Sequence, residues 1–388
     1  MEIRAILPNR SRDLRLDLFR GIANWAIFLN HMPENAVNWI TNRNYGFSDA
    51  ADLFVFISGY TVSLVYARMM LDHGFIVGAT RLFKRVWQLY VAYIVLFVLY
   101  LVSIGSAALY FNNSEILHEF NAAGLVNHPL EILSRGLLLQ FKPLNLDVLP
   151  LYIVLMAAFP GVLWLMLRKP DLVMLLSLAL YLAARLFGWN LPAYPAGVWY
   201  FNPFAWQLLF VFGCWCALGG VAGARAEILR LPALIYLGTA YLLFALVMTM
   251  AGRFPDFGNE FPKWLLDAFN PNDKTNLAPY RFLHFVVLAF LVTRALPKDW
   301  PGLKSKILAP AIKCGQQSLP VFCVGVLLSF VGHFALMLSS GSLTVQVLVA
   351  SVGITIMIAV AYYVSWSKKQ DRAVKGPPAV PSVKGSAS

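Results

Sequence analysis

The sequence predicts an all-α integral membrane protein with about ten transmembrane helices packed in one bundle. Of its 388 residues, 59% are hydrophobic and only 13% are charged, whereas soluble domains are about 45–50% apolar and about 25% charged. The apolar residues also fall into runs that are long enough to cross a bilayer, which takes about 17–25 residues. These two observations exclude an ordinary soluble globular enzyme.

Ten stretches have the length and hydropathy of membrane-spanning helices. In chain order they are residues 16–33, 50–70, 84–109, 146–167, 171–188, 204–221, 231–251, 281–297, 317–338 and 343–366. We expect them to form a single membrane domain over residues 1–366. Residues 367–388 are basic and rich in Pro, Ser and Gly, and this composition predicts a disordered cytoplasmic tail.

The basic residues are distributed unevenly between the two sides of the predicted bundle. With the N-terminus placed in the cytoplasm, 23 of the 31 Lys and Arg residues fall in inner segments and seven in outer segments. The positive-inside rule therefore predicts that both termini are cytoplasmic. The net charge of +12 does not predict nucleic-acid binding, because the basic residues lie between apolar runs. This arrangement suits contact with anionic lipid headgroups.

The first predicted span, residues 16–33, carries four polar residues, Asp17, Arg20, Asn24 and His31. At about 100° per residue they fall within about 60° of one another, and His31 lies about 16 Å beyond Arg20. Ionisable residues are costly inside a membrane and usually mark a functional site. The pattern therefore predicts a helix that faces a polar cavity. Alternatively, the charged pair anchors the helix at the interface and the histidine caps its far end.

Three other positions extend this candidate site. Asp52 begins the second span near the end of the first, where its carboxylate could orient His31 and raise its basicity. Arg81 and Arg85, at the cytoplasmic start of the third span, have the charge to bind phosphates. Asp147 enters the fourth span from the outer side. N-capping would equally explain the two aspartates, and positive-inside anchoring would explain the two arginines.

The outer loop over residues 188–206 is dense in aromatic side chains. Trp199 and Tyr200, followed by Asn202, suit stacking and hydrogen bonding to a sugar. Aromatic residues at span ends are also ordinary interfacial anchors, so this second explanation stays open. No metal site is expected, because the histidines on the spans have no adjoining cluster of carboxylates.

Several of these motifs together resemble a known family. Arg20, ten intervening residues and His31 match the R-x10-H signature of the membrane acyltransferase 3 superfamily. The stretch DLFVFISGY from Asp52 resembles the second-helix motif of that superfamily, and Arg81-x3-Arg85 resembles its cytoplasmic motif. Within it, the chain is most similar to the OpgC-type proteins, in the stretches FLNHMP, FSDAADLFVFISGY, PLNLDVLPLYIVLM and GQQSLPVFCVGVLLSF.

The resemblance implies an O-acyltransferase of the bacterial inner membrane that uses succinyl-CoA as its acyl donor. The acceptor would be a hydroxyl of an osmoregulated periplasmic glucan. His31 would be the general base or a transient acyl carrier, and Asp52 would orient it. Arg20, Arg81 and Arg85 would bind the CoA phosphates. From their position and chemistry, our own candidates for contact with the sugar are Asp147, Trp199, Tyr200 and Asn202.

Other readings of the sequence remain open at this point. The acceptor could be another envelope polysaccharide or a lipid-linked sugar. A polar cavity within a helical bundle also suits a transporter or flippase of an anionic lipid or sugar. A sensor or scaffold of the cell envelope is a further alternative. The sequence does not indicate the oligomeric state.

Overall fold

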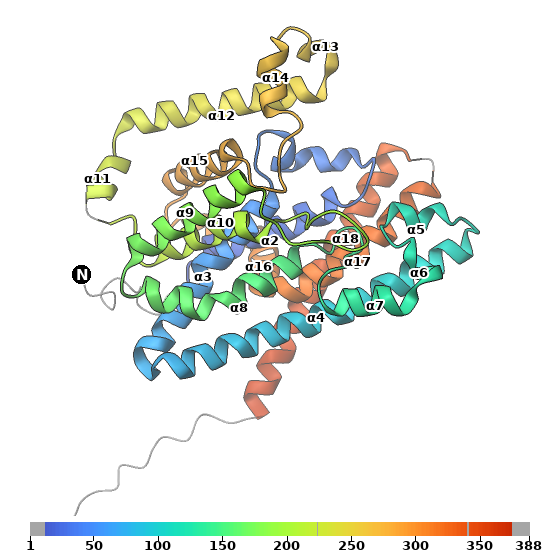
Figure 1. Ribbon diagram of the computed structural model, residues 1–388, viewed down its shortest axis with the longest axis horizontal. Coiled ribbons are helices and arrows are strands. Elements are labelled where there is room, and N and C mark those ends of the chain that lie inside the picture. The colour runs from blue at the N-terminus through green and yellow to red at the C-terminus, as the bar shows by residue number, and fades with distance from the viewer. Residues whose placement is uncertain (1–11, 223, 340, 375–388) are drawn as a thin grey trace, which may run out of the picture.

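The computed structural model describes residues 12–222, 224–339 and 341–374, and every regular element within them is a helix (Figure 1). The ten principal helices are α2 (Leu14–Asn30), α3 (Ala50–His73), α4 (Phe75–Tyr110), α8 (Val148–Met166), α9 (Pro170–Phe187), α10 (Pro203–Ala217), α12 (Pro232–Arg253), α15 (Pro279–Ala295), α17 (Ser318–Met337) and α18 (Leu343–Val374). Each corresponds to one predicted span, so the all-α membrane fold class is confirmed.

Shorter helices connect these ten. They are η1 (Ala36–Ile40), η2 (Asn42–Asn44), α5 (Glu115–Glu119), α6 (Gly124–Asn127), α7 (Pro129–Leu137), α11 (Ala224–Leu229), α13 (Pro255–Gly258), α14 (Lys263–Phe269), η3 (Pro301–Lys304) and α16 (Ala309–Gln316). Helix α12 lies at the edge of the bundle, where it packs against α15 (Figure 1).

Seven helices of the described residues are long and apolar enough to cross a membrane. The other three predicted spans are α2, α10 and α15, which have 17, 15 and 17 residues. Such helices are about 22–26 Å long, less than the roughly 30 Å thickness of a bilayer core. Helices α2 and α10 are largely buried, so protein surrounds much of their length in place of lipid.

Two boundaries differ from the predicted ones. Gly74 separates α3 from α4 and adopts a φ of 85°, so α4 starts at Phe75 and Arg81 and Arg85 lie inside it. The tail predicted over residues 367–388 is wrong for residues 367–374, which continue α18. The last turns contain Lys, Gln and Arg, which are good helix formers. Residues 375–388 lie outside the described part of the chain.

Close backbone contact between α3 and α10 organises the centre of the bundle. A Cβ atom at Gly59 of α3 would collide with the carbonyl of Phe210, and one at Gly213 of α10 would collide with the carbonyl of Phe56. Small residues of this kind let helices approach closely within a membrane. The contact fixes α3 in place, and α2 packs directly against α3.

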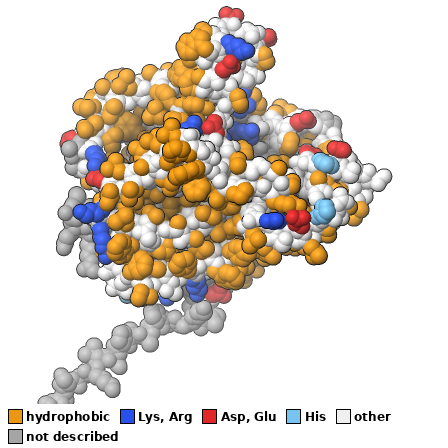
Figure 2. All heavy atoms as spheres, viewed as in Figure 1, with side chains coloured by type: hydrophobic (Ala, Val, Ile, Leu, Met, Phe, Trp, Pro, Cys, Tyr) orange, Lys and Arg blue, Asp and Glu red, His pale blue; other side chains and the backbone are white. Residues whose placement is uncertain are grey.

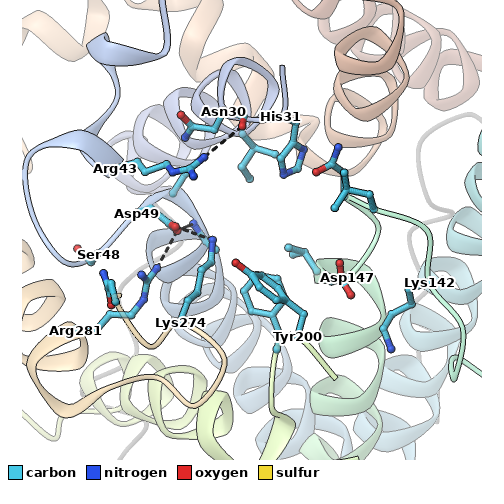
Figure 3. A pocket seen from close by; sticks show the side chains of 18 of the residues that line it. Asn30, His31, Arg43, Ser48, Asp49, Lys142, Asp147, Tyr200, Lys274 and Arg281 are labelled. Carbon is cyan, nitrogen blue, oxygen red and sulfur yellow. Dashed lines mark hydrogen bonds and ion pairs between the residues drawn. The ribbon is translucent and has the colours of Figure 1, made fainter. Parts of the chain in front are cut away.

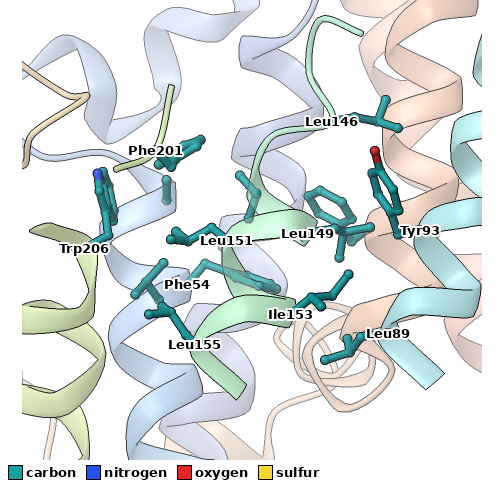
Figure 4. Close-up of a cluster of buried hydrophobic side chains, with 14 of the residues drawn as sticks. Phe54, Leu89, Tyr93, Leu146, Leu149, Leu151, Ile153, Leu155, Phe201 and Trp206 are labelled. Carbon is teal, nitrogen blue, oxygen red and sulfur yellow. The ribbon is translucent and has the colours of Figure 1, made fainter. Parts of the chain in front are cut away.

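A cluster of buried apolar side chains fills the space between α3, α8 and α10 (Figure 4). Phe54, Leu149, Leu151 and Trp206 are all nearly inaccessible to solvent. Hydrophobic side chains also cover much of the outer surface, while charged side chains gather at the end formed by α13 and α14 (Figure 2). An apolar surface of this kind suits contact with lipid.

Candidate functional site

Two cavities lie at opposite ends of the antiparallel pair α2 and α3, and we name them outer and inner after the orientation that the sequence predicts. The outer cavity, about 760 Å³, is bounded by the end of α2 and the start of α3, where His31 and Asp49 line it. The inner cavity, about 830 Å³, is bounded by the start of α2 and the second half of α3, where Arg20 and Tyr60 line it. Both volumes lie in the range of about 300–1,000 Å³ that is usual for ligand sites.

The polar face of α2 connects these two cavities. Arg20 lines the inner cavity and His31 lines the outer one, while Asn24 is buried between them. On this face Arg20 Nε, Asn24 Oδ1 and His31 Nδ1 are buried and have no hydrogen-bond partner among the described residues. Because buried polar atoms are normally paired, this face retains hydrogen-bonding capacity for a ligand.

The wall between the cavities is thin at the start of α8. Val148 lines the outer cavity, and the next residue, Leu149, lines the inner cavity. The ring of Phe54 packs close by, with its centroid 6.4 Å from that of Tyr152, which also lines the inner cavity. Apolar side chains of α3 and α8 therefore separate the two cavities at this point.

The inner cavity holds more cations than anions. Arg12 donates to Asp17 at 2.7 Å, and Arg15 donates to Asp13 at 2.8 Å. Two further arginines of the cavity have no carboxylate partner within the described chain. One is Arg20, which donates to the Thr61 hydroxyl at 2.7 Å. The other is the partly exposed Arg85 of α4, which donates to the Gln88 amide oxygen at 3.2 Å. This charge distribution suits an anionic ligand.

The predicted donor-site residues are brought together only in part. Arg20 and Arg85 both line the inner cavity, although they come from α2 and α4. Arg81 is exposed and does not line this cavity. It lies one turn earlier on α4, so its predicted contact with the phosphates is not supported by the geometry.

A buried cluster of ion pairs lies at the start of α3 (Figure 3). Asp49 accepts from Lys274 at 2.6 Å and lies 3.1 Å from Arg281. The fully buried Asp52 accepts from Arg281 Nε at 3.0 Å and from the Asp49 backbone N–H at 2.8 Å. The geometry therefore does not support the prediction that Asp52 orients His31, because its carboxylate is bound to these two partners. Its carboxylate caps α3 and binds Arg281, whereas Asp49 lines the outer cavity together with His31.

Asp49 is held in its charged form by this cluster. Burial alone would raise its pKa, but the charges of Lys274 and Arg281 outweigh that effect and hold the pKa of Asp49 below its usual range. The outer cavity therefore contains a fixed anion whose charge is already matched by two cations.

Lys142 and Asp147 lie across the outer cavity from His31 (Figure 3). The Lys142 ammonium is buried, donates to the Leu139 carbonyl at 3.1 Å and lies 3.8 Å from the centroid of the Trp199 ring. Burial lowers the pKa of Lys142 to about 8, and the charge of Asp147 opposes this shift. Burial also raises the pKa of Asp147 to about 6, against the effect of Lys142. Both groups therefore titrate near neutral pH.

The residues predicted to contact a sugar separate into two groups. Asp147 and Tyr200 line the outer cavity, and Tyr200 is 48% exposed. Trp199 and Asn202 are buried and do not line it. The tryptophan ring supports Lys142, and Asn202 caps α10 through its contact with the Phe204 N–H. These two residues shape the loop and do not face the cavity.

Sequence reasoning did not assign the cations of the outer cavity to a site, although the sequence contains a signal for them. Basic residues are disfavoured on the outer side of a membrane protein. Those that occur there are therefore candidates for a functional site. The predicted orientation places seven Lys and Arg residues on that side. Five of the seven line the outer cavity, namely Arg43, Lys142, Arg253, Lys274 and Arg281.

Comparison with known proteins identifies the family to which the chain belongs. Residues 12–369 match the family model described as OpgC protein, and the match covers nearly the whole chain. No curated protein and no solved structure gave a significant match. The match supports an acyltransferase of the OpgC type in general terms, and the membrane-spanning helices agree with it. The chain belongs to the OpgC family.

Proposed function

We propose that this protein is a membrane O-acyltransferase that moves a succinyl group from CoA in the cytoplasm to a hydroxyl of a periplasmic glucan. One observation carries the proposal. The polar face of α2 runs from a cation-rich inner cavity to His31 in the outer cavity. Membership in the OpgC family supports acyl transfer, and the bias of basic residues supports the orientation.

The inner cavity suits the donor. Arg20 and Arg85 provide guanidinium groups for phosphate oxygens, which arginine binds in a bidentate geometry. Helical geometry separates Arg20 from His31 by about 16 Å along α2. The long pantetheine arm of CoA can extend over such a distance, so the thioester would approach His31 while the nucleotide stays on the inner side.

His31 is suited to activate the acceptor. A sugar hydroxyl has a pKa far above 7 and needs a base where it attacks. The imidazole takes the hydroxyl proton while the oxygen forms a bond with the thioester carbonyl carbon. The carbon–sulfur bond then breaks, and the departing CoA thiolate takes the proton from the imidazole. In a two-step alternative, an imidazole nitrogen attacks the thioester carbonyl carbon, the carbon–sulfur bond breaks and CoA leaves as the thiol with the imidazole proton. The sugar oxygen then takes the acyl group from the imidazole, which recovers a proton from the hydroxyl.

The outer cavity suits a carbohydrate acceptor. Its lining combines aromatic rings with amide side chains, including Tyr194, Tyr200, Gln140 and Asn145. Aromatic faces stack on sugar rings, and amides both donate and accept hydrogen bonds with hydroxyl groups. This lining supports a glucan, and it would also accept another envelope polysaccharide or a lipid-linked sugar.

Mass spectrometry of envelope glucans from cells with and without the protein tests this proposal. We expect succinylated glucans only when the protein is present, and the same product from purified protein, succinyl-CoA and glucan. A transporter or flippase would leave no acylated product in the purified system, and a sensor or scaffold would tolerate loss of His31. Unmodified glucans in both experiments, with the protein folded in the membrane, would refute the proposal.

A further inference from the structure

The outer cavity contains cations that form no ion pair with a carboxylate of the described residues. Two of its five basic side chains are bound to Asp49. The remaining three, Arg43, Lys142 and Arg253, line the cavity but form no ion pair in the described part of the chain. The cavity therefore has an excess of positive charge that is available to a ligand.

Two of these cations adjoin His31. A side chamber of about 330 Å³ is lined by His31, Arg43 and Arg253, together with Glu34, which forms no ion pair with either arginine. Arg43 Nη1 donates to the carbonyl of Asn30, the residue before His31, at 3.4 Å (Figure 3). Arg253 Nη2 donates to the Arg43 carbonyl at 3.5 Å. Both arginines are exposed, so a ligand in the cavity can reach them.

The proposed direction of transfer determines where the acyl group lies. If CoA occupies the inner cavity and its thioester carbonyl lies at His31, the rest of the acyl group projects into the outer cavity. A succinyl group ends in a second carboxylate only a few bonds beyond the carbonyl. Burial of that carboxylate without a partner would be costly, whereas a guanidinium group can bind it through two parallel hydrogen bonds.

We propose that Arg43 and Arg253 bind the terminal carboxylate of the acyl group, so that the enzyme selects donors with a second carboxylate over neutral donors of the same length. This inference rests on the proposed function. The bound carboxylate would also offset the positive charge beside His31, which otherwise opposes protonation of the imidazole during transfer. Selection of the donor and activation of the acceptor would then be coupled at one place.

Lys142 is the competing candidate for this role, and the geometry favours the arginines. Lys142 lies on the far side of the outer cavity from His31 (Figure 3). Its ammonium also has two local contacts, the Leu139 carbonyl and the face of Trp199. It does not line the side chamber that His31 shares with the two arginines.

The test compares succinyl-CoA with butyryl-CoA, which has the same number of acyl carbons but no terminal carboxylate. The purified full-length protein is assayed with glucan, and the ratio of the two kcat/KM values is measured. We expect the parent to prefer succinyl-CoA. We expect Arg43→Gln and Arg253→Gln each to lower the ratio by about 10- to 100-fold, the effect of losing a charged hydrogen bond. Arg→Lys at either position should retain part of the preference.

Controls separate this inference from a folding defect and from the proposed function. Lys263→Gln, at the exposed first residue of α14, removes an outer cation that lines neither cavity and should leave the ratio unchanged. Retained CoA binding shows that each variant is folded. The inference would be overturned if both arginine variants kept the parent's ratio of kcat/KM values, or if only Lys142→Gln lowered it. In either case the parent would still transfer succinyl groups, so the proposed function would stand. Failure of the parent to use either thioester would refute the proposed function itself.

Discussion

The inner and outer cavities hold their charges in different ways. In the inner cavity the ion pairs are local, since Arg12 pairs with Asp17 and Arg15 with Asp13, and the Arg12 side chain is 58% exposed. In the outer cavity a buried pair joins Arg281 of α15 to Asp52 of α3, and both side chains are almost inaccessible. The outer cavity is therefore preorganised by contacts between distant segments, whereas the inner cavity presents cations that can adjust to a flexible ligand.

The largest expected effect is at His31, which lines the outer cavity. His31→Gln should lower kcat by about 10²–10⁴-fold, because it removes the general base. The KM for succinyl-CoA should stay near that of the parent, since the donor binds in the other cavity. Steady-state kinetics on purified protein measures both quantities. A kcat within a fewfold of the parent would exclude His31 as the base, and a loss well beyond 10⁴-fold would favour an acyl-histidine intermediate.

The buried ion pair should matter most for stability. Arg281→Met leaves Asp52 buried without its cation and should cost about 3–5 kcal/mol, measured as a lower Tm in detergent. The matched control is Arg135→Gln, because Arg135 forms an exposed pair with Glu131. Exposed pairs contribute about 0–1 kcal/mol. Similar losses of Tm in the two variants would show that the outer cavity is not held by its buried pair.

The positive charge of the inner cavity should affect the KM for succinyl-CoA. Arg85→Gln should raise the KM for succinyl-CoA by about 10- to 100-fold, the effect of losing a charged hydrogen bond. Arg81→Gln is the control, since Arg81 lies one turn away on α4 and does not line the cavity. Its KM should remain close to that of the parent. Equal changes in both variants would indicate a general effect of charge near the membrane surface.

A further expected effect concerns the pH dependence of stability at Lys142. Burial lowers the pKa of Lys142 in the folded protein from 10.5 to about 8. The unfolded chain therefore binds more protons between pH 8 and pH 10.5, and the stability of the parent should rise with pH in that window. At pH 7 the Tm of Lys142→Met should exceed that of the parent, and the difference between the two Tm values should become small near pH 10. A constant difference in Tm at both pH values would contradict the assigned shift.

Much of this arrangement could be predicted from sequence because it depends on periodicity. The polar face of α2, with Arg20, Asn24 and His31, follows from helical geometry alone. The ion-pair partner of Asp52 could not be predicted from the sequence. Arg281 lies 229 residues further along the chain, and only the tertiary fold brings the two together. The burial of Trp199 could not be predicted for a related reason, since a sequence does not show which aromatic rings of a loop turn inward.

The central claim is that donor and acceptor enter from opposite sides and meet at His31. Proteoliposomes of known orientation test it most directly, with succinyl-CoA supplied to one face and glucan to the other. The account predicts succinylated glucan only when the CoA thioester is on the face of Arg85 and the glucan is on the face of Tyr200. It also predicts no product from His31→Gln under the same conditions. Product formation only when both substrates are on one face would contradict the account.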